Sequence, residues 1–388
     1  MGNGEVAHFQ LGSAGDAFAI PDLAFPGKLS NIIIGVLLLG IAAYAWWLRS
    51  KSEQVAIWLI SVAAALFVLS FLIWVVSGAN ITTISLSSLL AGAVVLAVPL
   101  VFGSLSGVLC ERAGVVNIAI EGQLLGGAFT AALVSSMTKN AFLGLIAAGI
   151  AGALVSLVLA LFSIKYLVNQ IIVGVVLNVL VSGITGFLFT TVMQEDPELY
   201  NSPVHLPVID IPVLSSIPVI GPILFRQSVI GYLMYIAVFV VWFGLFKTKW
   251  GLRVRAVGEH PKAADTLGIK VNRTRFWNVT LGGIVAGIGG SFFTLVAIDS
   301  FTKEISGGRG FIALAAVIFG RWNPIGAFLA ALLFGFADNL QVILTIIGTP
   351  VPSQFMAMMP YLVTIFAVSG LVGRSRGPAA AGEPYVKE

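Results

Sequence analysis

Eleven long apolar stretches follow one another along the chain, and they constrain its fold more than any other feature. A helix that crosses a bilayer needs about 20 predominantly apolar residues. The stretches cover residues 31–48, 55–76, 84–110, 116–137, 141–164, 169–193, 229–246, 278–298, 310–320, 325–348 and 357–373. Because 310–320 is too short to span alone, we expect it to be a half-helix or to be extended by its neighbours.

The composition supports the same interpretation. Of the 388 residues, 58% are hydrophobic and only 10% are charged, whereas a soluble domain has about 25% charged residues. A water-soluble protein of this composition has too little polar surface to cover its core. We therefore predict an all-α polytopic membrane protein with about ten core spans within 55–373, plus one extra N-terminal span at 31–48.

The charges between the spans predict the orientation of the chain, because basic residues concentrate in cytoplasmic loops. The loop 247–277 holds eight Lys and Arg residues against two acidic ones. The loop 194–228 holds four acidic residues, Arg226 and six prolines, so we expect a non-helical outer loop. Eleven crossings then place the polar tail 1–30 outside and the tail 374–388 in the cytoplasm.

Several kinds of site are excluded by residue counts. Cys110 is the sole cysteine, and the three histidines, His8, His205 and His260, are far apart in the sequence, so we expect no disulfide and no metal site. No phosphate-binding loop of the Gly-x-x-x-x-Gly-Lys-Ser/Thr type occurs, so this chain is not expected to bind ATP by that route. The basic residues flank the membrane, which gives no indication of nucleic-acid binding.

Charged residues inside or beside the spans are candidates for function, because a charge at the bilayer centre costs at least about 2.5–3.5 kcal/mol. They are Glu111, Arg112, Glu121, Arg309, Arg321 and Asp338. Glu111 and Arg112 either end a span in an interfacial loop or serve function. For Glu121 and Asp338 we favour a packed hydrogen bond between helices over direct contact with a ligand.

Amide side chains within the spans form a second group of candidates, namely Asn169, Gln170, Asn178 and Asn339. Amides both donate and accept hydrogen bonds, so they suit a neutral hydroxylated or heterocyclic ligand. They can equally serve as hydrogen bonds between helices. The glycines at 282–283, 287 and 289–290 indicate close helix packing.

Two glycine-rich breaks, within 104–137 and 299–335, show a weak internal sequence similarity. Inverted repeats with broken helices are typical of transporters.

The loop 247–277 contains a short bracketed helix. Pro261 suits a first helical position and Gly268 the position after a helix end, with Ala263, Ala264 and Leu267 expected on one face. Asn272 is expected to cap the next helix. A two-turn helix is unstable alone, so we predict that it fits a groove on another protein. A basic loop resting on anionic lipid is the alternative.

These segments carry a resemblance. Residues 255–269, which read RAVGEHPKAADTLGI, resemble the coupling loop of bacterial ABC importer permeases of the branched-chain amino acid, simple sugar and nucleoside branch. Residues 111–122 resemble the broken segment of that branch. The segments 308–313, 320–326 and 377–386 are most similar to the nucleoside-type members.

The resemblance implies a transport subunit of the bacterial plasma membrane without catalytic residues. It implies a second homologous permease, separate ATPase subunits that carry ATP and Mg²⁺, and an extracytoplasmic substrate-binding lipoprotein. With the amides above, the candidate pathway residues are Glu111, Asn117, Glu121, Asn169, Asn178, Arg309 and Asn339. The candidate ATPase-coupling residues are Glu259, Pro261, Ala263, Ala264, Leu267 and Gly268.

Two other functions stay open from the residues alone. One is an ion-coupled secondary transporter with Glu111, Glu121 or Asp338 as a proton relay, and the other is a structural or channel protein with no energy coupling. Within the importer class, sugars and amino acids remain alternative substrates to nucleosides.

Overall fold

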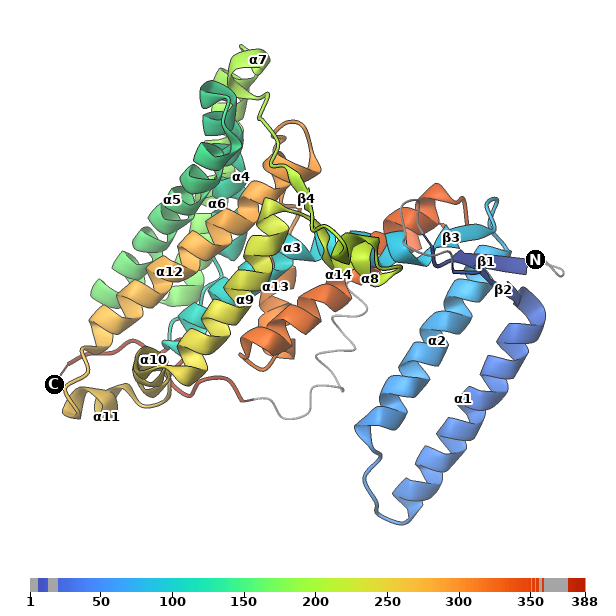
Figure 1. Cartoon of the computed structure of the whole chain (residues 1–388). Coiled ribbons are helices and arrows are strands. Elements are labelled where there is room, and N and C mark those ends of the chain that lie inside the picture. The colour runs from blue at the N-terminus through green and yellow to red at the C-terminus, as the bar shows by residue number, and fades with distance from the viewer. Residues whose placement is uncertain are drawn as a thin grey trace. The chain divides into compact units, whose positions relative to one another are not determined.

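The structure, a computed structural model, describes residues 6–12, 20–349, 351–352, 354–355, 358 and 376–387 (Figure 1). The chain forms two compact units. One comprises residues 1–92, 211–226 and 337–359, and the other comprises 93–210, 227–336 and 360–388. The second unit contains the segments that the sequence singles out for coupling.

Helices occupy ten of the eleven predicted spans. They are α1 (Gly27–Ser50), α2 (Ile57–Ser77), α3 (Leu86–Arg112), α4 (Ile120–Thr138), α5 (Ala141–Ala160), α6 (Gln170–Leu188), α9 (Val229–Lys247), α12 (Val271–Phe292), α13 (Arg309–Phe319) and α14 (Pro324–Ile346). Short π-helical turns, Leu161–Lys165, Phe189–Met193 and Phe293–Ala297, extend α5, α6 and α12. Of the eleventh predicted span, 357–373, the structure describes only residue 358.

Eight of these helices are long and apolar enough to cross a membrane, counting only the described residues. The two others are α4, which is built largely of small residues, and α13, which has only 11 residues. Of the two possibilities left open for 310–320, the structure shows the half-helix, because α13 is not extended by its neighbours. The chain is an all-α, multi-pass membrane protein with broken helices.

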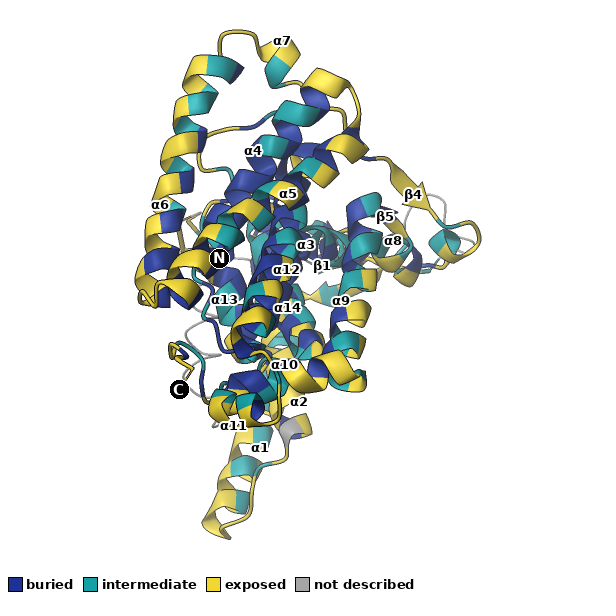
Figure 2. Cartoon of the chain, turned by 90° about the vertical axis from the view of Figure 1, so that its left-hand side faces the viewer, coloured by how far each residue is buried: buried dark blue, intermediate teal, exposed yellow. Residues whose placement is uncertain are grey.

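The larger unit is held together by glycine contacts among α4, α5 and α12. A Cβ on Gly152 would lie 2.1 Å from the carbonyl oxygen of Gly283, and one on Gly127 would lie 2.3 Å from that of Gly287. Only glycine allows the backbones to approach so closely. The predicted packing role of the glycines at 282–290 is confirmed, and Figure 2 shows α4 and α12 largely buried.

The smaller unit contains a helical hairpin and a small sheet. α1 and α2 pack together, and Ser70 Oγ donates to Asn31 Oδ1 at 2.7 Å. The sheet has the order β2-β1-β3, formed by β1 (Val6–Gln10), β2 (Leu23–Pro26) and β3 (Thr83–Ser85). β1 pairs antiparallel with β2, Val6 facing Pro26, and parallel with β3, His8 facing Thr83. The tail 1–30 thus holds strands that its sequence did not lead us to expect.

The loop 194–228 contains several short helices and strands. They are the single-turn helices α7 (Pro197–Tyr200) and α8 (Ile220–Leu224), a 3₁₀ turn (Leu214–Ser216) and the paired strands β4 (Val208–Asp210) and β5 (Arg226–Ser228). Asp196 caps α7 by accepting from the N–H of Leu199 at 3.1 Å. The expected non-helical loop is therefore only partly correct, because Asp-Pro is a strong start signal for even a single turn.

The basic segment 247–277 contains α10 (Lys249–Glu259) and α11 (Pro261–Thr266), joined by His260. Pro261 begins α11 as expected, and Gly268, with φ of +81°, follows its end. The expectation that Asn272 caps the next helix is wrong, because α12 already begins at Val271 after Lys270. Within the larger unit, α10 and α11 lie at one end of α5 and α12, and α7 lies at the other (Figure 1).

Candidate functional site

The two predicted helix breaks meet in the larger unit, and Glu121 joins them. Its Oε1 accepts from Ser306 Oγ at 2.6 Å and from the N–H of Gly308 at 2.9 Å. Its Oε2 accepts from the N–H of Gly310 at 2.6 Å. The first N–H groups of a helix lack partners within the helix and carry a partial positive charge. The Glu121 carboxylate therefore caps the half-helix α13 from the first turn of α4.

Glu111 and Arg112, at the end of α3, contact the turn between α13 and α14. The indole N–H of Trp322 donates to Glu111 Oε2. Arg112 Nε donates to the carbonyl oxygen of Trp322 at 2.9 Å. Arg112 also lies 4.0 Å from Glu259 of α10. The pair thus links the first break to the α13–α14 turn and to the basic segment.

Asn117 lies within the first break, in a completely buried amide and hydroxyl network. Its Nδ2 donates to Ser106 Oγ and to Gln123 Oε1, each at 3.1 Å. Gln123 Nε2 in turn donates to Ser156 Oγ at 2.8 Å. Buried polar groups that are hydrogen-bonded together define a unique packing. The network fixes the break relative to α3, α4 and α5.

Side chains of α6 satisfy the backbone of the same break. Asn178 Oδ1 accepts from the N–H of Gly122 at 2.8 Å, and its Nδ2 donates to the carbonyl oxygen of Ile118 at 2.9 Å. Gln170 Oε1 accepts from the N–H of Val116 at 2.7 Å. An irregular segment at membrane depth needs such partners because lipid offers none. In this structure both amides therefore support the backbone of the break.

Two of the remaining candidate pathway residues, Asn169 and Asn339, lie apart from this cluster, whereas Arg309 borders it. Asn169 is exposed and caps α6, accepting from the N–H of Ile171 at 2.9 Å. The Arg309 guanidinium lies 5.6 Å from the ring centre of Phe293. Asn339 belongs to the smaller unit, where its Nδ2 donates to the carbonyl oxygen of Leu89 at 2.7 Å. The structure brings together Glu121, Asn117 and Asn178, with Arg309 next to the capped helix end.

The predicted coupling residues do not share one face of α11. Ala264 is buried in a cluster with Val257 of α10, Val271 of α12 and Tyr385. Leu267, in contrast, is 81% exposed, and Ala263 is exposed as well. The expectation of one common face is therefore wrong: Ala264 packs inward against the chain, and Ala263 and Leu267 face outward.

The other coupling candidates border this helix. Glu259 Oε2 accepts from the N–H of Ala379 at 3.2 Å, and Pro261 is half-buried. Cavities lie on both sides of α11. One, of about 930 Å³, is lined by residues that include Trp250, Leu267 and Gly268, and the other, of about 480 Å³, is lined by residues that include Pro261 and Ala263. The exposed edge of α11 therefore lies between the two cavities.

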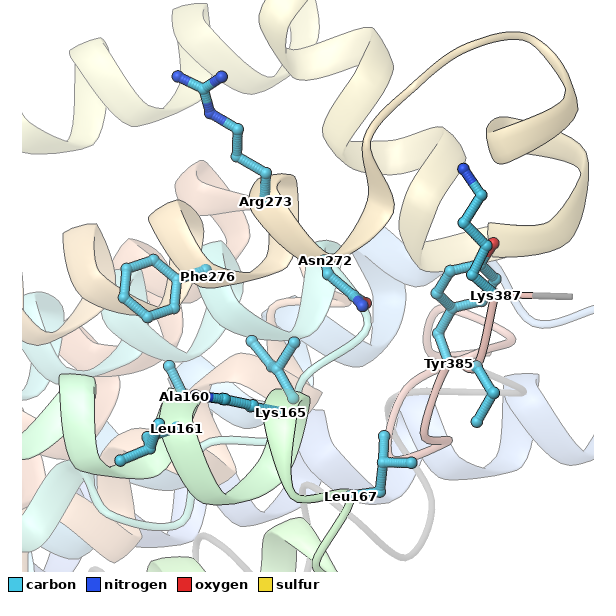
Figure 3. A pocket seen from close by; sticks show the side chains of 11 residues that line it. Ala160, Leu161, Lys165, Leu167, Asn272, Arg273, Phe276, Tyr385 and Lys387 are labelled. Carbon is cyan, nitrogen blue, oxygen red and sulfur yellow. The ribbon is translucent and has the colours of Figure 1, made fainter.

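A further cavity of about 530 Å³ lies beside the start of α12 (Figure 3). Its lining comes from the end of α5, from the first turn of α12 and from the tail, and includes Leu161, Lys165, Phe276, Tyr385 and Lys387. The tail residues thus line cavities on both sides of their own segment.

Residues that the sequence analysis did not select complete the site. Gln123 and Trp322 are direct partners of Asn117 and Glu111, and Arg275 of α12 is 2% exposed and contacts the tail. A glutamine next to the glycine-rich break offered a signal for Gln123. Trp322 and Arg275 gave no local signal, because their partners are 211 and 108 residues away in the sequence.

Comparison with known proteins identifies the architecture. The family model described as "Branched-chain amino acid transport system / permease component" matches residues 89–368. The guanosine ABC transporter permease protein NupQ of Bacillus subtilis is 41% identical over 311 residues, which are 78% of this chain and 97% of NupQ. The nucleoside ABC transporter permease protein NupC of Lactococcus lactis is 37% identical over 312 residues, which are 78% of this chain and 98% of NupC.

A solved structure of a metal-chelate type ABC transporter in an inward-facing conformation matches with a TM-score of 0.44 and 18% identity, covering 72% of this chain and 85% of that one. The family match covers well over half of the chain, and both relatives align along almost their whole length. The chain therefore belongs to the branched-chain amino acid transport system permease family of ABC transporters.

Proposed function

We propose that this chain forms part of the pathway of an ATP-driven importer that carries nucleosides across the plasma membrane. The observation that carries the proposal is the 41% and 37% identity to permeases named for guanosine and nucleosides, along 97% and 98% of their lengths. Only 10% of the residues are charged, which supports a neutral solute.

The proposed partners follow from the transport class. ATP and Mg²⁺ belong to separate ATPase subunits, which would contact the exposed edge of α11. A second homologous permease would complete the pathway, and an extracytoplasmic binding lipoprotein would deliver the solute. Leu267 supports the ATPase contact, because an 81% exposed leucine at the edge of a cavity can insert into a groove on a partner.

The proposed orientation places α10 and α11 in the cytoplasm and α7 outside. Eight basic residues in 247–277 and four acidic residues in 194–228 support it. Within the larger unit, α7 and the pair α10 and α11 lie at opposite ends of α5 and α12 (Figure 1). The N-terminus would then lie outside and the C-terminus inside. The tail 376–387 packs at the α10–α11 end, which is consistent with that assignment.

The contacts of α10 suggest how movement of α11 would reach the pathway. A Cβ on Gly258 would lie 2.2 Å from the carbonyl oxygen of Arg112, so α10 touches the end of α3 directly. Arg112 and Glu111 bind the turn at Trp322, which follows the half-helix α13. Displacement of α10 and α11 by ATPase subunits would therefore act on both helix breaks, with Glu121 keeping them in register.

The test is ATP-dependent uptake by the complex that this chain forms. The tagged chain is purified from its native membrane in mild detergent with its partners, reconstituted into liposomes and supplied with labelled guanosine. We expect co-purification of an ATPase and a second multi-span protein, and uptake that requires ATP and is inhibited by excess nucleoside. Inhibition by glucose or leucine instead of nucleosides would overturn the substrate. Uptake that persists without ATP and collapses with a protonophore would overturn the importer itself.

A further inference from the structure

The tail 376–387 is packed into the α10–α11 end of the larger unit. Tyr385 is 8% exposed and belongs to one cluster with Val257 of α10, Ala264 of α11 and Val271 of α12. A single tail side chain thus belongs to the cluster that joins α10, α11 and α12. Figure 3 shows Tyr385 beside the first turn of α12, near Asn272.

The tail backbone connects α10 to the first helix break. The N–H of Ala380 donates to the carbonyl oxygen of Gly258 at 2.9 Å, and the N–H of Gly382 donates to that of Gly114 at 3.4 Å. Gly114 has φ of +87° and lies in the break between α3 and α4. The point where the tail binds α10 and the point where it binds the break are therefore neighbours along the tail.

A buried cation holds the tail at this position. Arg275 of α12 is 2% exposed, and its Nη1 donates to the carbonyl oxygen of Glu383 at 2.7 Å. Its Nε and Nη2 have no hydrogen-bond partner among the described residues. A buried charge is costly unless it is hydrogen-bonded, so loss of the tail carbonyl would leave Arg275 poorly satisfied. The tail is therefore part of the folded unit.

The last contact of the tail returns to α11, where Lys387 Nζ lies 3.8 Å from Asp265 Oδ1. We propose that residues 378–387 form a tie that makes α11 and the break at Gly114 move together, with Tyr385 as its positioning residue. The proposal rests on the proposed function, because the tie transmits the displacement that ATPase subunits impose on α11. It assigns to the tail a role in energy coupling.

The first test compares variants of Tyr385 in the reconstituted complex. Tyr385→Ala removes the ring from the cluster, Tyr385→Phe keeps it, and Val386→Ala is the matched control because Val386 is 61% exposed. We measure guanosine uptake and ATP hydrolysis in the same liposomes. For Tyr385→Ala we expect uptake per ATP hydrolysed to fall roughly three- to thirtyfold, the range for loss of a coupling contact. The other two variants should match the wild type.

Two outcomes would contradict the tie. One is an unchanged ratio of uptake to ATP hydrolysis in Tyr385→Ala, including the case in which both fall equally. The other is loss of the ATPase subunit from the purified variant complex, which would make Tyr385 part of docking or folding. The wild-type complex separates this proposal from the proposed function. If the wild-type complex shows no ATP-dependent uptake, the proposed function is wrong. If it shows such uptake, the Tyr385 variants test the tie alone.

The second test avoids any loss of packing. Asp265→Cys and Lys387→Cys are combined and joined with a short bis-maleimide, and the native Cys110 does not compete because it is completely buried. If the tail and α11 move as one body, the cross-linked complex should retain uptake. Uptake that stops only after cross-linking would show that the tail must leave α11, and failure of the cross-link to form would show that the two are not adjacent. Either result would overturn the tie.

Discussion

The N–H of Gly310 donates to the carboxylate of Glu121 at 2.6 Å, although 189 residues separate the two in the sequence. This bond joins the first turn of α4 to the first turn of α13, each of which follows a helix break. A Cβ on Gly310 would lie 2.4 Å from the backbone nitrogen of Glu121, so the two helix ends are in direct contact. The two helix breaks therefore form one structural feature.

Replacement of Glu121 by alanine should strongly destabilise the chain. Its carboxylate accepts three hydrogen bonds, and each bond to a charged acceptor contributes roughly 1.5–3 kcal/mol. We expect Glu121→Ala to lower the melting temperature in detergent by roughly 5 °C or more. Glu121→Gln should have a smaller effect, because one carbonyl oxygen remains. The control is Glu304→Gln, an exposed carboxylate that accepts from Ser182. Equal shifts for the alanine variant and this control would contradict the cap.

Glycine contacts between helices predict opposite effects at two helical positions. Gly152→Ala would place a Cβ 2.1 Å from the carbonyl oxygen of Gly283, whereas a Cβ on Gly183 would meet no described atom within 4 Å. Overpacking costs about 1–3 kcal/mol or more, so Gly152→Ala should reduce the yield of monodisperse protein and its melting temperature. Gly183→Ala should be neutral or stabilising by about 0.5–1 kcal/mol, because alanine favours the helix. A stable Gly152→Ala variant would refute the close approach of α5 and α12.

The indole of Trp322 provides a test of the link between α3 and the α13–α14 turn. Trp322→Phe keeps a ring but removes the N–H that donates to Glu111, which is 8% exposed. A buried acceptor left without its donor costs about 1–3 kcal/mol, so the variant should unfold at a lower temperature. Trp277→Phe is the matched control, since Trp277 is 54% exposed. The link would be refuted if both variants melted at the same temperature as the wild type.

The apolar runs of the sequence are sufficient to locate the ten helices that occupy the predicted spans, but not the short helices between them. The predicted span 229–246 corresponds to α9, Val229–Lys247, and 325–348 corresponds to α14, Pro324–Ile346. Such boundaries follow from local chemistry, because a span ends where polar or helix-breaking residues begin. Strand β1 could not be found in this way, because its two partners lie before α1 and after α2.

The partners of the polar residues could not be predicted for the same reason. Asn178 is identified from sequence as an intramembrane amide, yet its partners, Gly122 and Ile118, lie 56 and 60 residues earlier. The direction of Ala264 was predicted wrongly, because a helix of six residues has no measurable hydrophobic period. The partners of Asn178 and the direction of Ala264 are determined only when the break and the tail pack against α6 and α11.

The outward face of α11 gives a final prediction, on the proposed ATPase contact. Leu267 is 81% exposed, so Leu267→Arg should leave the melting temperature of the chain unchanged. If ATPase subunits bind this edge, the bulky charge should remove them from the purified complex and abolish ATP-dependent uptake, because an unpaired charge buried in an interface is costly. Ala264→Arg should behave differently: Ala264 is 2% exposed, so that variant should lose folding as well as uptake. Thr266→Arg, on the exposed neighbour Thr266, tests whether the effect depends on position. Full retention of the ATPase subunit by Leu267→Arg would show that the partner binds elsewhere.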